Sequence, residues 1–287
     1  MTGRAGGVVL TVGDLVLDVA VDVGSDLVPR GDTTSTVHVR RGGSAANVAV
    51  SVVDAGGAAR FAGAVGDDAA GRLAVGELVD AGVDVHVERR GRTGTVVALV
   101  DPHGERSMLT DRGAADSLVE LPTRLLDDVG AVHVPAYGLL GGGALAEASR
   151  AALRRAPDGA WRSVDASSVS LLDRAGVQQL GSSCHELAVD VLVANVDEAT
   201  ALGWPDSWMD HVPVRIVKLG PDGAELLSDG GRTVVATEAI RGVDTTGAGD
   251  AFAGGLLAAL VRGSGVEDAV RYGHAAASRL LRARRDD

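Results

Sequence analysis

Residues 244–255 read Asp-Thr-Thr-Gly-Ala-Gly-Asp-Ala-Phe-Ala-Gly-Gly, a glycine-rich loop that leads into an apolar helix. Gly247 and Gly249 permit backbone conformations and close approaches that a β-carbon would hinder. N–H groups at a helix start, with the helix dipole behind them, suit the charge that develops on a transferring phosphoryl group. Asp250 lies at the same helix start and is suited to accept a proton from an attacking alcohol. For Gly-x-Gly-Asp alone, an N-cap beside an ordinary turn is the commoner explanation.

The composition favours one α/β domain. The chain has 287 residues, of which 46% are hydrophobic, enough for a sizeable core. Aromatic residues make up only 2% of the chain, so Ala, Val and Leu must fill that core, which favours helices packed on a Val-rich sheet. We therefore expect a single domain over residues 1–287, with an insertion, rather than two small domains.

The charge and the rare residue types exclude several classes of function. A net charge of −12 makes nucleic acid and anionic membranes poor partners. Cys184 is the single cysteine, which excludes an internal disulfide and a multi-thiolate metal site and favours a cytoplasmic location. Lys218 is the single lysine, and no glycine-rich loop ends in Lys-Ser or Lys-Thr, so a P-loop enzyme is excluded. No membrane segment is expected, because proline, histidine and glycines interrupt the uncharged stretch 129–146 and the N-terminus lacks a secretory leader.

Strand and helix patterns alternate along the chain. Short apolar runs followed by segments at helical spacing predict strand–helix units. The expected strands are 8–12, 60–64, 131–135, 161–165 and 191–194, and the helices after them begin near residues 43, 69, 144, 171 and 196. Strands at 213–219, 223–228 and 233–237 precede two final helices at 249–261 and 266–282. Such alternation predicts a three-layer αβα fold with a mostly parallel central sheet.

Two segments show a different pattern, that of strands with one wet face. Residues 15–23 and 34–40 alternate apolar and polar side chains. Residues 94–111 indicate a hairpin that turns at 102–104. We expect 15–40 and 94–111 to form a small β flap, or lid, inserted in the domain, with the sheet edge beside the flap as the alternative place for the hairpin.

The whole string at 244–255 resembles the C-terminal signature of the ribokinase-like (PfkB-type) carbohydrate kinase family. In that family the Gly-Ala-Gly backbone forms an anion hole and the following Asp is the catalytic base. The resemblance therefore assigns these roles to Gly247, Ala248, Gly249 and Asp250. Matching motifs occur in the same order over nearly the whole chain, so the resemblance implies a ribokinase-like fold with a lid.

Two N-terminal motifs are similar to the family's sugar-binding residues. Residues 41–49, Arg-Gly-Gly-Ser-Ala-Ala-Asn-Val-Ala, resemble a signature in which paired glycines approach the sugar and an Asn binds its hydroxyls. The corresponding residues here are Gly42, Gly43 and Asn47, although a glycine loop before a buried helix explains them equally well. Asp14 and Asp18 resemble the acidic residues that hold substrate hydroxyls from the first strand and the flap, with a solvated flap residue as the alternative for the second.

Other matches lie on the expected nucleotide side. Asn195 and Glu198 resemble an Asn-x-x-Glu motif associated with water-mediated Mg²⁺ and phosphate positioning. A helix N-cap with a helpful Glu competes with that role. The resemblance also assigns nucleotide contacts to Lys218, Gly220, Gly223, Thr246 and His274, the last of which fits a packed or solvated histidine as well.

Two assignments concern further ligands. Asp244, with Thr246, matches part of a monovalent cation site, which in ribokinase is occupied by K⁺. Ribokinase continues beyond its last helix into a loop that contributes to this site, whereas this sequence stops at residue 287, which leaves K⁺ activation open. Arg106 is a candidate partner for a carboxylate or phosphate on the substrate, or a support for the flap.

The resemblance implies ATP-dependent phosphorylation of a hydroxyl, expected to be primary, on a small sugar such as ribose, with ATP and Mg²⁺ as cofactors. A nucleoside kinase is the close alternative, although few aromatic residues are available to stack on a base. A non-catalytic sugar-binding regulator is more distant. A dinucleotide-dependent oxidoreductase is a third class of function, but this sequence has no Gly-x-Gly-x-x-Gly motif at the helix after the first strand. The expected partners are the sugar, ATP and a second copy of the chain that pairs through the lid.

Overall fold

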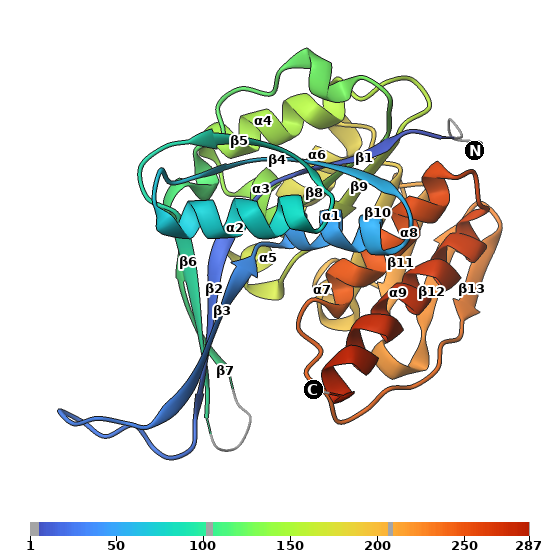
Figure 1. Cartoon of the computed structure of the whole chain (residues 1–287). Coiled ribbons are helices and arrows are strands. Elements are labelled where there is room, and N and C mark those ends of the chain that lie inside the picture. Colours follow the sequence, from blue (N-terminus) through green and yellow to red (C-terminus); the bar gives the residue numbers. More distant parts are fainter. Residues whose placement is uncertain (1–5, 102–105, 206–208, 287) are drawn as a thin grey trace.

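The computed structural model describes residues 6–101, 106–205 and 209–286. Helices cover both faces of a large sheet, and a smaller sheet projects from one side of this body (Figure 1). The expected turn at 102–104 lies outside the described residues. No helix among those described is both long and apolar enough to cross a membrane.

The large sheet has the strand order β13-β12-β11-β10-β9-β8-β1-β4-β5. All neighbouring pairs are parallel except those of β12 and β13, which form an antiparallel hairpin at one edge. The inner strands are almost fully buried, as strands covered on both faces must be. The bounds are β1 Val8–Val12, β4 Ala58–Val65, β5 Asp84–Arg89, β8 Val129–Pro135, β9 Trp161–Asp165, β10 Val191–Asn195, β11 Val214–Lys218, β12 Ala224–Ser228 and β13 Gly231–Val235.

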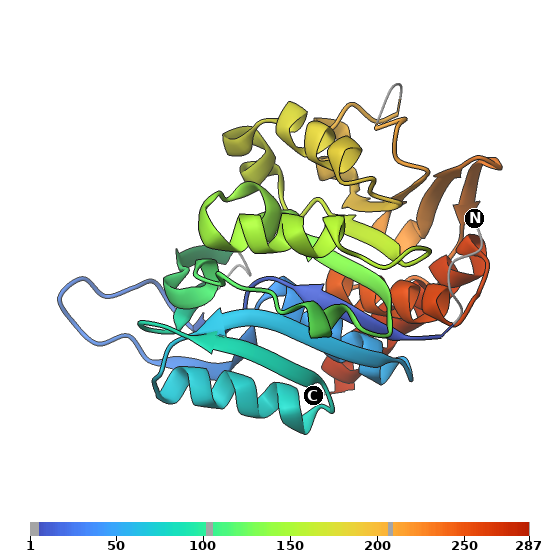
Figure 2. The same ribbon diagram turned by 90° about the horizontal axis from the view of Figure 1, so that it is seen from above.

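Each face of this sheet is covered by its own helices (Figure 2), and each has its own apolar core. One face carries α1 (Ser44–Asp54), α2 (Ala69–Asp80), α8 (Ala248–Val261) and α9 (Val266–Asp286). The other carries α3 (Ala136–Leu140), α4 (Gly143–Arg154), α5 (Val169–Ala175), α6 (Val177–Glu186) and α7 (Val196–Ala201). Short 3₁₀ turns lie at Gly113–Asp116, Thr123–Leu126 and Gly220–Asp222.

Helix α8 is buried on all sides from Ala251 to Val261 because it packs between α1 and α9. Its sequence is apolar all round, as a helix without a solvent face requires. Gly254 and Gly255 allow close contact, since a β-carbon at either would fall within 3 Å of Ser51 on α1 or of Tyr272 on α9. The N-terminus of α8 is thereby held in a fixed position.

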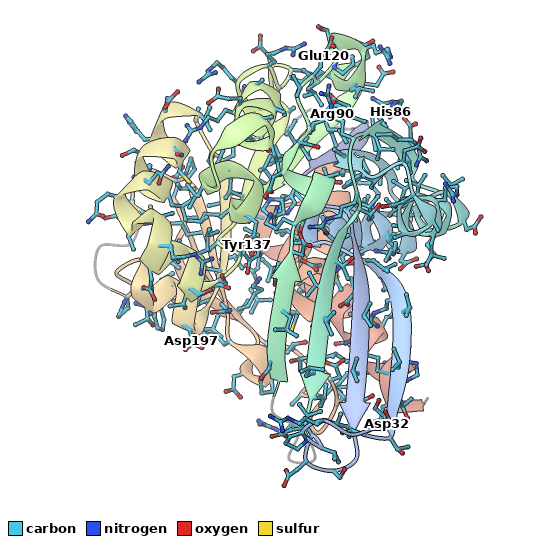
Figure 3. All side chains as sticks on the ribbon, turned by 90° about the vertical axis from the view of Figure 1, so that its left-hand side faces the viewer. Asp32, His86, Arg90, Glu120, Tyr137 and Asp197 are labelled. Carbon is cyan, nitrogen blue, oxygen red and sulfur yellow. The ribbon has the colours of Figure 1, made fainter. Side chains whose placement is uncertain are left out.

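The small sheet is the expected lid. It has the order β3-β2-β6-β7, with β2 at Val16–Val23, β3 at Ser35–Gly42, β6 at Gly94–Val100 and β7 at Arg106–Asp111. The segments 15–40 and 94–111 thus meet in one sheet through the parallel pair β2–β6. Figure 3 shows it extending away from the body, with Asp32 at its far end and Tyr137 near its base.

The structure confirms the three-layer fold and the lid, and it differs from the expected elements in three places. The single helix expected near 171–180 is two helices, α5 and α6, divided at Gly176 with a φ of +90°. The edge strand β5 and the short helix α3 are additional.

Candidate active site

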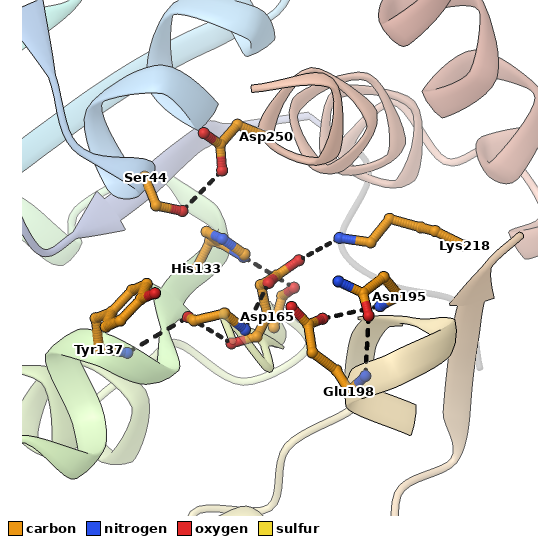
Figure 4. A network of polar contacts seen from close by, with 10 residues as sticks. Ser44, His133, Tyr137, Asp165, Asn195, Glu198, Lys218 and Asp250 are labelled. Atoms are coloured by element: carbon orange, nitrogen blue, oxygen red, sulfur yellow. Dashed lines mark hydrogen bonds and ion pairs between the residues drawn. The ribbon is translucent and has the colours of Figure 1, made fainter. Parts of the chain in front are cut away.

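Polar side chains converge where several parallel strands end at their carboxyl edge. Asp14 follows β1, and Asp165, Asn195 and Lys218 are the last residues of β9, β10 and β11. The N-terminus of α8, with Asp250, faces this edge (Figure 4). Open α/β sheets bind their ligands at such an edge.

Asp250 is held by two side chains of α1. Ser44 Oγ donates a hydrogen bond to Oδ1 at 2.7 Å, and Asn47 Nδ2 donates one to Oδ2 at 2.9 Å. Arg41 in turn donates from Nη1 to Asn47 Oδ1 at 2.7 Å, which turns the Asn47 amide nitrogen toward the carboxylate. The sequence motif at 41–49 therefore orients the predicted base.

The pKa of Asp250 is raised to about 7. Burial is the largest cause, and the negative charge of Asp165 adds to it, whereas the hydrogen bonds from Asn47 and Ser44 and the charge of Lys218 lower it. A carboxyl group with a pKa near neutrality is well matched to general-base catalysis.

The predicted anion hole lies beside Asp250. Gly247 is the N-cap of α8 and has left-handed backbone angles, with a φ of +75°. A β-carbon at Gly249 would come within 3.0 Å of Lys218 Nζ, so a glycine there lets the ammonium group approach the loop. Backbone N–H groups and a lysine charge meet at this point, as stabilisation of a phosphoryl group requires.

Lys218 forms an ion pair with Asp165, Nζ to Oδ2 at 2.8 Å. Burial by itself lowers the pKa of Lys218 and raises that of Asp165, but their mutual attraction and hydrogen bonds outweigh it, so that the pKa of Lys218 is raised and that of Asp165 is lowered. His133 on β8 lies nearby, with Nδ1 3.1 Å from Ser163 Oγ, and burial lowers its pKa to about 4. His133 is thus neutral at physiological pH.

Asn195 and Glu198 form a capping box at the start of α7. Glu198 N donates to Asn195 Oδ1 at 2.9 Å, and Asn195 N donates to Glu198 Oε2 at 2.8 Å. Burial and the charge of Asp165 raise the pKa of Glu198. The helix-cap explanation of this motif is therefore realised, and the Mg²⁺ role stays a prediction.

A pocket of about 350 Å³ contains most of the residues predicted on the nucleotide side. His274 closes one wall, where its ring lies edge-on to Phe252 at 5.2 Å and Nε2 is 3.1 Å from the Val235 carbonyl oxygen. Burial lowers the pKa of His274. Predicted site residues that line this pocket are Asn195, Lys218, Gly220, Gly223, Ala248, Gly249 and His274.

The predicted substrate residues other than Arg106 lie at the base of the lid, whereas Arg106 pairs with Val100 toward the other end of the lid. Gly43 has a φ of +106°, and a β-carbon there would be 2.3 Å from the Asp14 carbonyl oxygen. A β-carbon at Gly42 would be 2.9 Å from the β-carbon of Asp18. Asp18 lines a second pocket of about 260 Å³, together with Asn47, Thr246 and Gly247. Thr246 thus lies in this pocket rather than in the nucleotide pocket.

Arg112, just after β7, was not among the predicted residues. Its Nη1 is 3.9 Å from Asp14 Oδ2, and its Nε donates to Asp116 Oδ1 at 2.6 Å. The guanidinium lies 5.9 Å from the centre of the Tyr137 ring. Its Nη2 is buried without a hydrogen-bond partner in the described part of the chain. Arg106 lies in β7 opposite Val100, and its side chain is outside what the structure describes.

Asp244 accepts hydrogen bonds from two directions. Its Oδ1 accepts from Thr246 N at 2.8 Å, and its carbonyl oxygen accepts from Arg284 Nη1 at 3.0 Å. Arg284 Nη1 is also 3.2 Å from Asp244 Oδ2. The predicted cation ligand is thus bound by an arginine from the last helix.

Sequence reasoning missed Ser44, Asp165, Arg112 and Arg284. Ser44 stands inside the motif at 41–49, and Asp165 ends a buried strand, so both carried a signal. The two arginines gave none, because only the folded chain brings them to the site.

Acidic, histidine and cysteine side chains form no cluster of three or more suited to a metal within the residues described. A larger hollow of about 750 Å³ lies along β5 and contains none of the predicted site residues. Figure 3 labels His86, Arg90 and Glu120 on its walls.

Comparison with known proteins agrees with this geometry. Residues 8–285 match the family described as pfkB family carbohydrate kinase. The ATP-dependent ribose-1-phosphate kinase of Halopiger xanaduensis is 34% identical over 284 residues, which span 93% of this chain and 89% of that protein. Fructokinase-1 of Oryza sativa subsp. japonica is 29% identical, with 82% and 80% covered.

Solved structures show the same fold. A probable sugar kinase from Rhizobium etli CFN 42 has a TM-score of 0.83 at 26% identity and covers 98% of this chain and 94% of its own. Ribokinase from Thermotoga maritima has a TM-score of 0.79 at 24% identity, with 96% and 93% covered. The chain therefore belongs to the pfkB family of carbohydrate kinases, which are ATP-dependent sugar kinases.

Proposed function

We propose that this chain transfers the γ-phosphoryl group of ATP to a hydroxyl of a ribose-type sugar, expected to be a primary one, with Asp250 as the general base. One observation carries the proposal. The Asp250 carboxyl group lies at the start of α8 beside the glycine loop, accepts hydrogen bonds from Ser44 and Asn47, and has a pKa of about 7. That arrangement joins a proton acceptor to a cradle for the transferring group.

In the proposed step, the sugar hydroxyl oxygen attacks the γ-phosphorus, the bond to the β-phosphate oxygen breaks, and ADP leaves. The hydroxyl proton passes to Asp250. Backbone N–H groups of 247–249 and the Lys218 ammonium offset the negative charge that accumulates on the phosphoryl oxygens. The lid excludes water, which would otherwise act as the acceptor.

The donor set near Asn195 fits Mg²⁺ held through water. Glu198 and Asp165 supply carboxylate oxygens beside Asn195 and Lys218 of the nucleotide pocket, and after burial the charge of Asp165 also raises the pKa of Glu198. Mg²⁺ prefers oxygen ligands and keeps several of its waters. Asn195 and Glu198 would hold the ion through water, and it would supply positive charge that offsets part of the negative charge of the phosphates.

Ribose 1-phosphate is the acceptor that we favour within the ribose class. The relative at 34% identity is named a ribose-1-phosphate kinase. Arg112 supports an anionic acceptor, because its guanidinium lies beside Asp14 with a buried Nη2 that has no hydrogen-bond partner among the described residues. Guanidinium groups bind phosphate oxygens strongly.

A panel of acceptors tests these proposals. ADP release would be measured with ribose, ribose 1-phosphate, fructose and adenosine at fixed MgATP, and we expect the highest kcat/KM for ribose 1-phosphate. Arg112→Gln should lower kcat/KM for ribose 1-phosphate about tenfold or more, as loss of a charge-assisted hydrogen bond implies, and should change that for free ribose little. A preference for adenosine would favour the nucleoside kinase, and no turnover with any acceptor would argue against the assigned reaction.

We also propose that two copies pair through the lid. One lid face carries a row of facing residues, Val39, Val19, Val97 and Leu109, one from each strand. Val39 and Leu109 are 49% and 58% exposed, which is costly for apolar side chains in water. For location, the cytoplasm remains the proposal, since it supplies ATP and keeps Cys184 reduced.

A further inference from the structure

The last helix reaches the loop that precedes the predicted base. Arg284, near the C-terminal end of α9, donates from Nη1 to the Asp244 carbonyl oxygen at 3.0 Å and lies 3.2 Å from Asp244 Oδ2. Leu280, one turn earlier on the same helix, would be 3.9 Å from a β-carbon at Gly247. One face of α9 is therefore packed against residues 244–247.

Asp244 transmits this contact along the loop. Its Oδ1 accepts a hydrogen bond from Thr246 N at 2.8 Å, so the carboxylate fixes the turn that leads into Gly247. Gly247 is the N-cap of α8, and Asp250 lies in the first turn of that helix. A chain of short contacts thus joins Arg284 to the residues assigned to phosphoryl transfer.

A K⁺ ion at Asp244 would need oxygen ligands, and this residue offers its carboxylate and its carbonyl oxygen. Here the guanidinium already contacts both the carboxylate and the carbonyl oxygen of Asp244. Arginine stays protonated at every physiological pH. The residues present therefore do not fit K⁺ at this position.

We propose that Arg284 is a positioning residue that replaces a monovalent cation, so that its fixed positive charge holds the anion-hole loop and the enzyme needs no K⁺. This proposal rests on the function proposed for residues 247–250. Arg284 acts through Asp244 and the loop, and does not itself touch the reacting groups.

A plain surface ion pair is the competing explanation, and such pairs contribute little. The Arg284 side chain is only 19% exposed, whereas Arg282 on the same helix is 48% exposed and pairs with a Glu238 side chain that is 70% exposed. Arg284 also lines the 260 Å³ pocket together with Thr246 and Gly247. Its contacts are thus with the loop itself rather than with a solvated carboxylate alone.

The experiment compares wild type, Arg284→Ala and Arg279→Ala in buffers whose only salt is choline chloride, KCl or guanidinium chloride. Arg279 is an exposed arginine of the same helix and serves as the matched control. We expect the wild-type and Arg279→Ala rates to be the same in choline and in K⁺. Arg284→Ala should lose about ten- to a hundredfold in kcat in choline, because a loop misplaced by about 1 Å costs as much as that. K⁺ or millimolar guanidinium should restore much of this loss, while the KM for the sugar stays unchanged.

Two further variants keep the test decisive. Arg284→Lys retains a positive charge and should keep an intermediate rate if Arg284→Ala does not fold. Asp244→Asn removes the carboxylate that a cation would bind, so its loss of rate should not be restored by K⁺. Activation of the wild type by K⁺, or a wild-type kcat for Arg284→Ala in choline, would overturn the proposal.

Thermal unfolding separates this proposal from the proposed function. K⁺ in place of choline should raise the Tm of Arg284→Ala but not that of the wild type, whatever the acceptor. If no acceptor is phosphorylated, the proposed function fails, yet the Tm comparison still tests the cation. If K⁺ raised the Tm of both proteins equally, the role proposed for Arg284 would be contradicted, and the proposed function would be unaffected.

Discussion

At Asp250, burial and hydrogen bonding act in opposite directions on one carboxyl group. Removal from water and the charge of Asp165 raise its pKa, and the donors Ser44 and Asn47 lower it, so that it settles at about 7. An Asp in an unfolded chain has a pKa of about 3.9. Between these two pH values Asp250 is protonated in the folded protein but ionised in the unfolded chain. This difference stabilises the folded state at low pH, and the stabilisation is lost as the pH rises through about 7.

Asp250→Asn should lower kcat by about 10²–10⁴, the usual loss for a general base. It should also raise the Tm at pH 8, because an amide replaces a carboxylate that is costly to bury in its charged form. Kinetics and thermal unfolding at pH 5 and pH 8 check both effects. The Tm difference should be smaller at pH 5, and a near-normal kcat would remove Asp250 from its role.

The pH profile of kcat/KM should fall below about pH 7, where Asp250 in the free enzyme becomes protonated. Ser44→Ala removes a donor that lowers this pKa, so the acid limb should move to higher pH. Ser182→Ala, at an exposed position on α6, is the control. An unchanged acid limb in Ser44→Ala would mean that another group controls the profile.

At the scale of elements, one glycine joins the lid to α1. Gly43 has a φ of +106° and lies against the Asp14 carbonyl oxygen, so the ends of β1 and β3 and the start of α1 meet there. Gly56, after α1, also has a positive φ, of +76°, but has open space around it. A substitution at Gly56 therefore tests backbone strain alone, whereas one at Gly43 tests backbone strain together with steric overlap.

Gly56→Ala should cost about 1–2 kcal/mol of the free energy of unfolding, the price of a left-handed backbone for a residue with a β-carbon. Gly43→Ala should cost more, because it adds an overlap with Asp14, and it alone should raise the KM for the sugar. Denaturant titration and steady-state kinetics of both variants measure these effects. Equal losses of stability with an unchanged KM would place Gly43 outside the substrate site.

The elements also show how far sequence reasoning extends. Strand and helix order followed from periodicity, and the loop at 244–250 from its glycines and its Asp. The break between α5 and α6 was not predicted, because an isolated Gly is tolerated in a helix and the sequence does not show that Gly176 takes a φ of +90°. Strand β5 alternates apolar and polar residues, as a half-buried edge strand does, but it is only six residues long and its signal was overlooked. Arg112 and Arg284 reach the site through contacts between segments distant in sequence, which no local pattern encodes.

For the molecule as a whole, pairing through the lid is the property most open to measurement. Light scattering after gel filtration should give twice the mass of one chain. Val39→Asp places a charge on the apolar lid face and should give the mass of a single chain. His38→Asp, at the neighbouring exposed position on the opposite face, should leave the dimer intact. A monomeric wild type at all concentrations would exclude the lid dimer.

Lys218 has a consequence for chemical labelling. It is the single lysine among the 27 lysine and arginine residues of the chain. Its ammonium group is paired with Asp165 inside the nucleotide pocket, and the ion pair raises its pKa. Besides the α-amino group, amine-directed reagents would thus have one target side chain, which reacts slowly because it stays protonated. It lies at the point where ATP is proposed to bind. Acylation of that side chain, and protection by nucleotide, would report on occupancy of the pocket without any engineered probe.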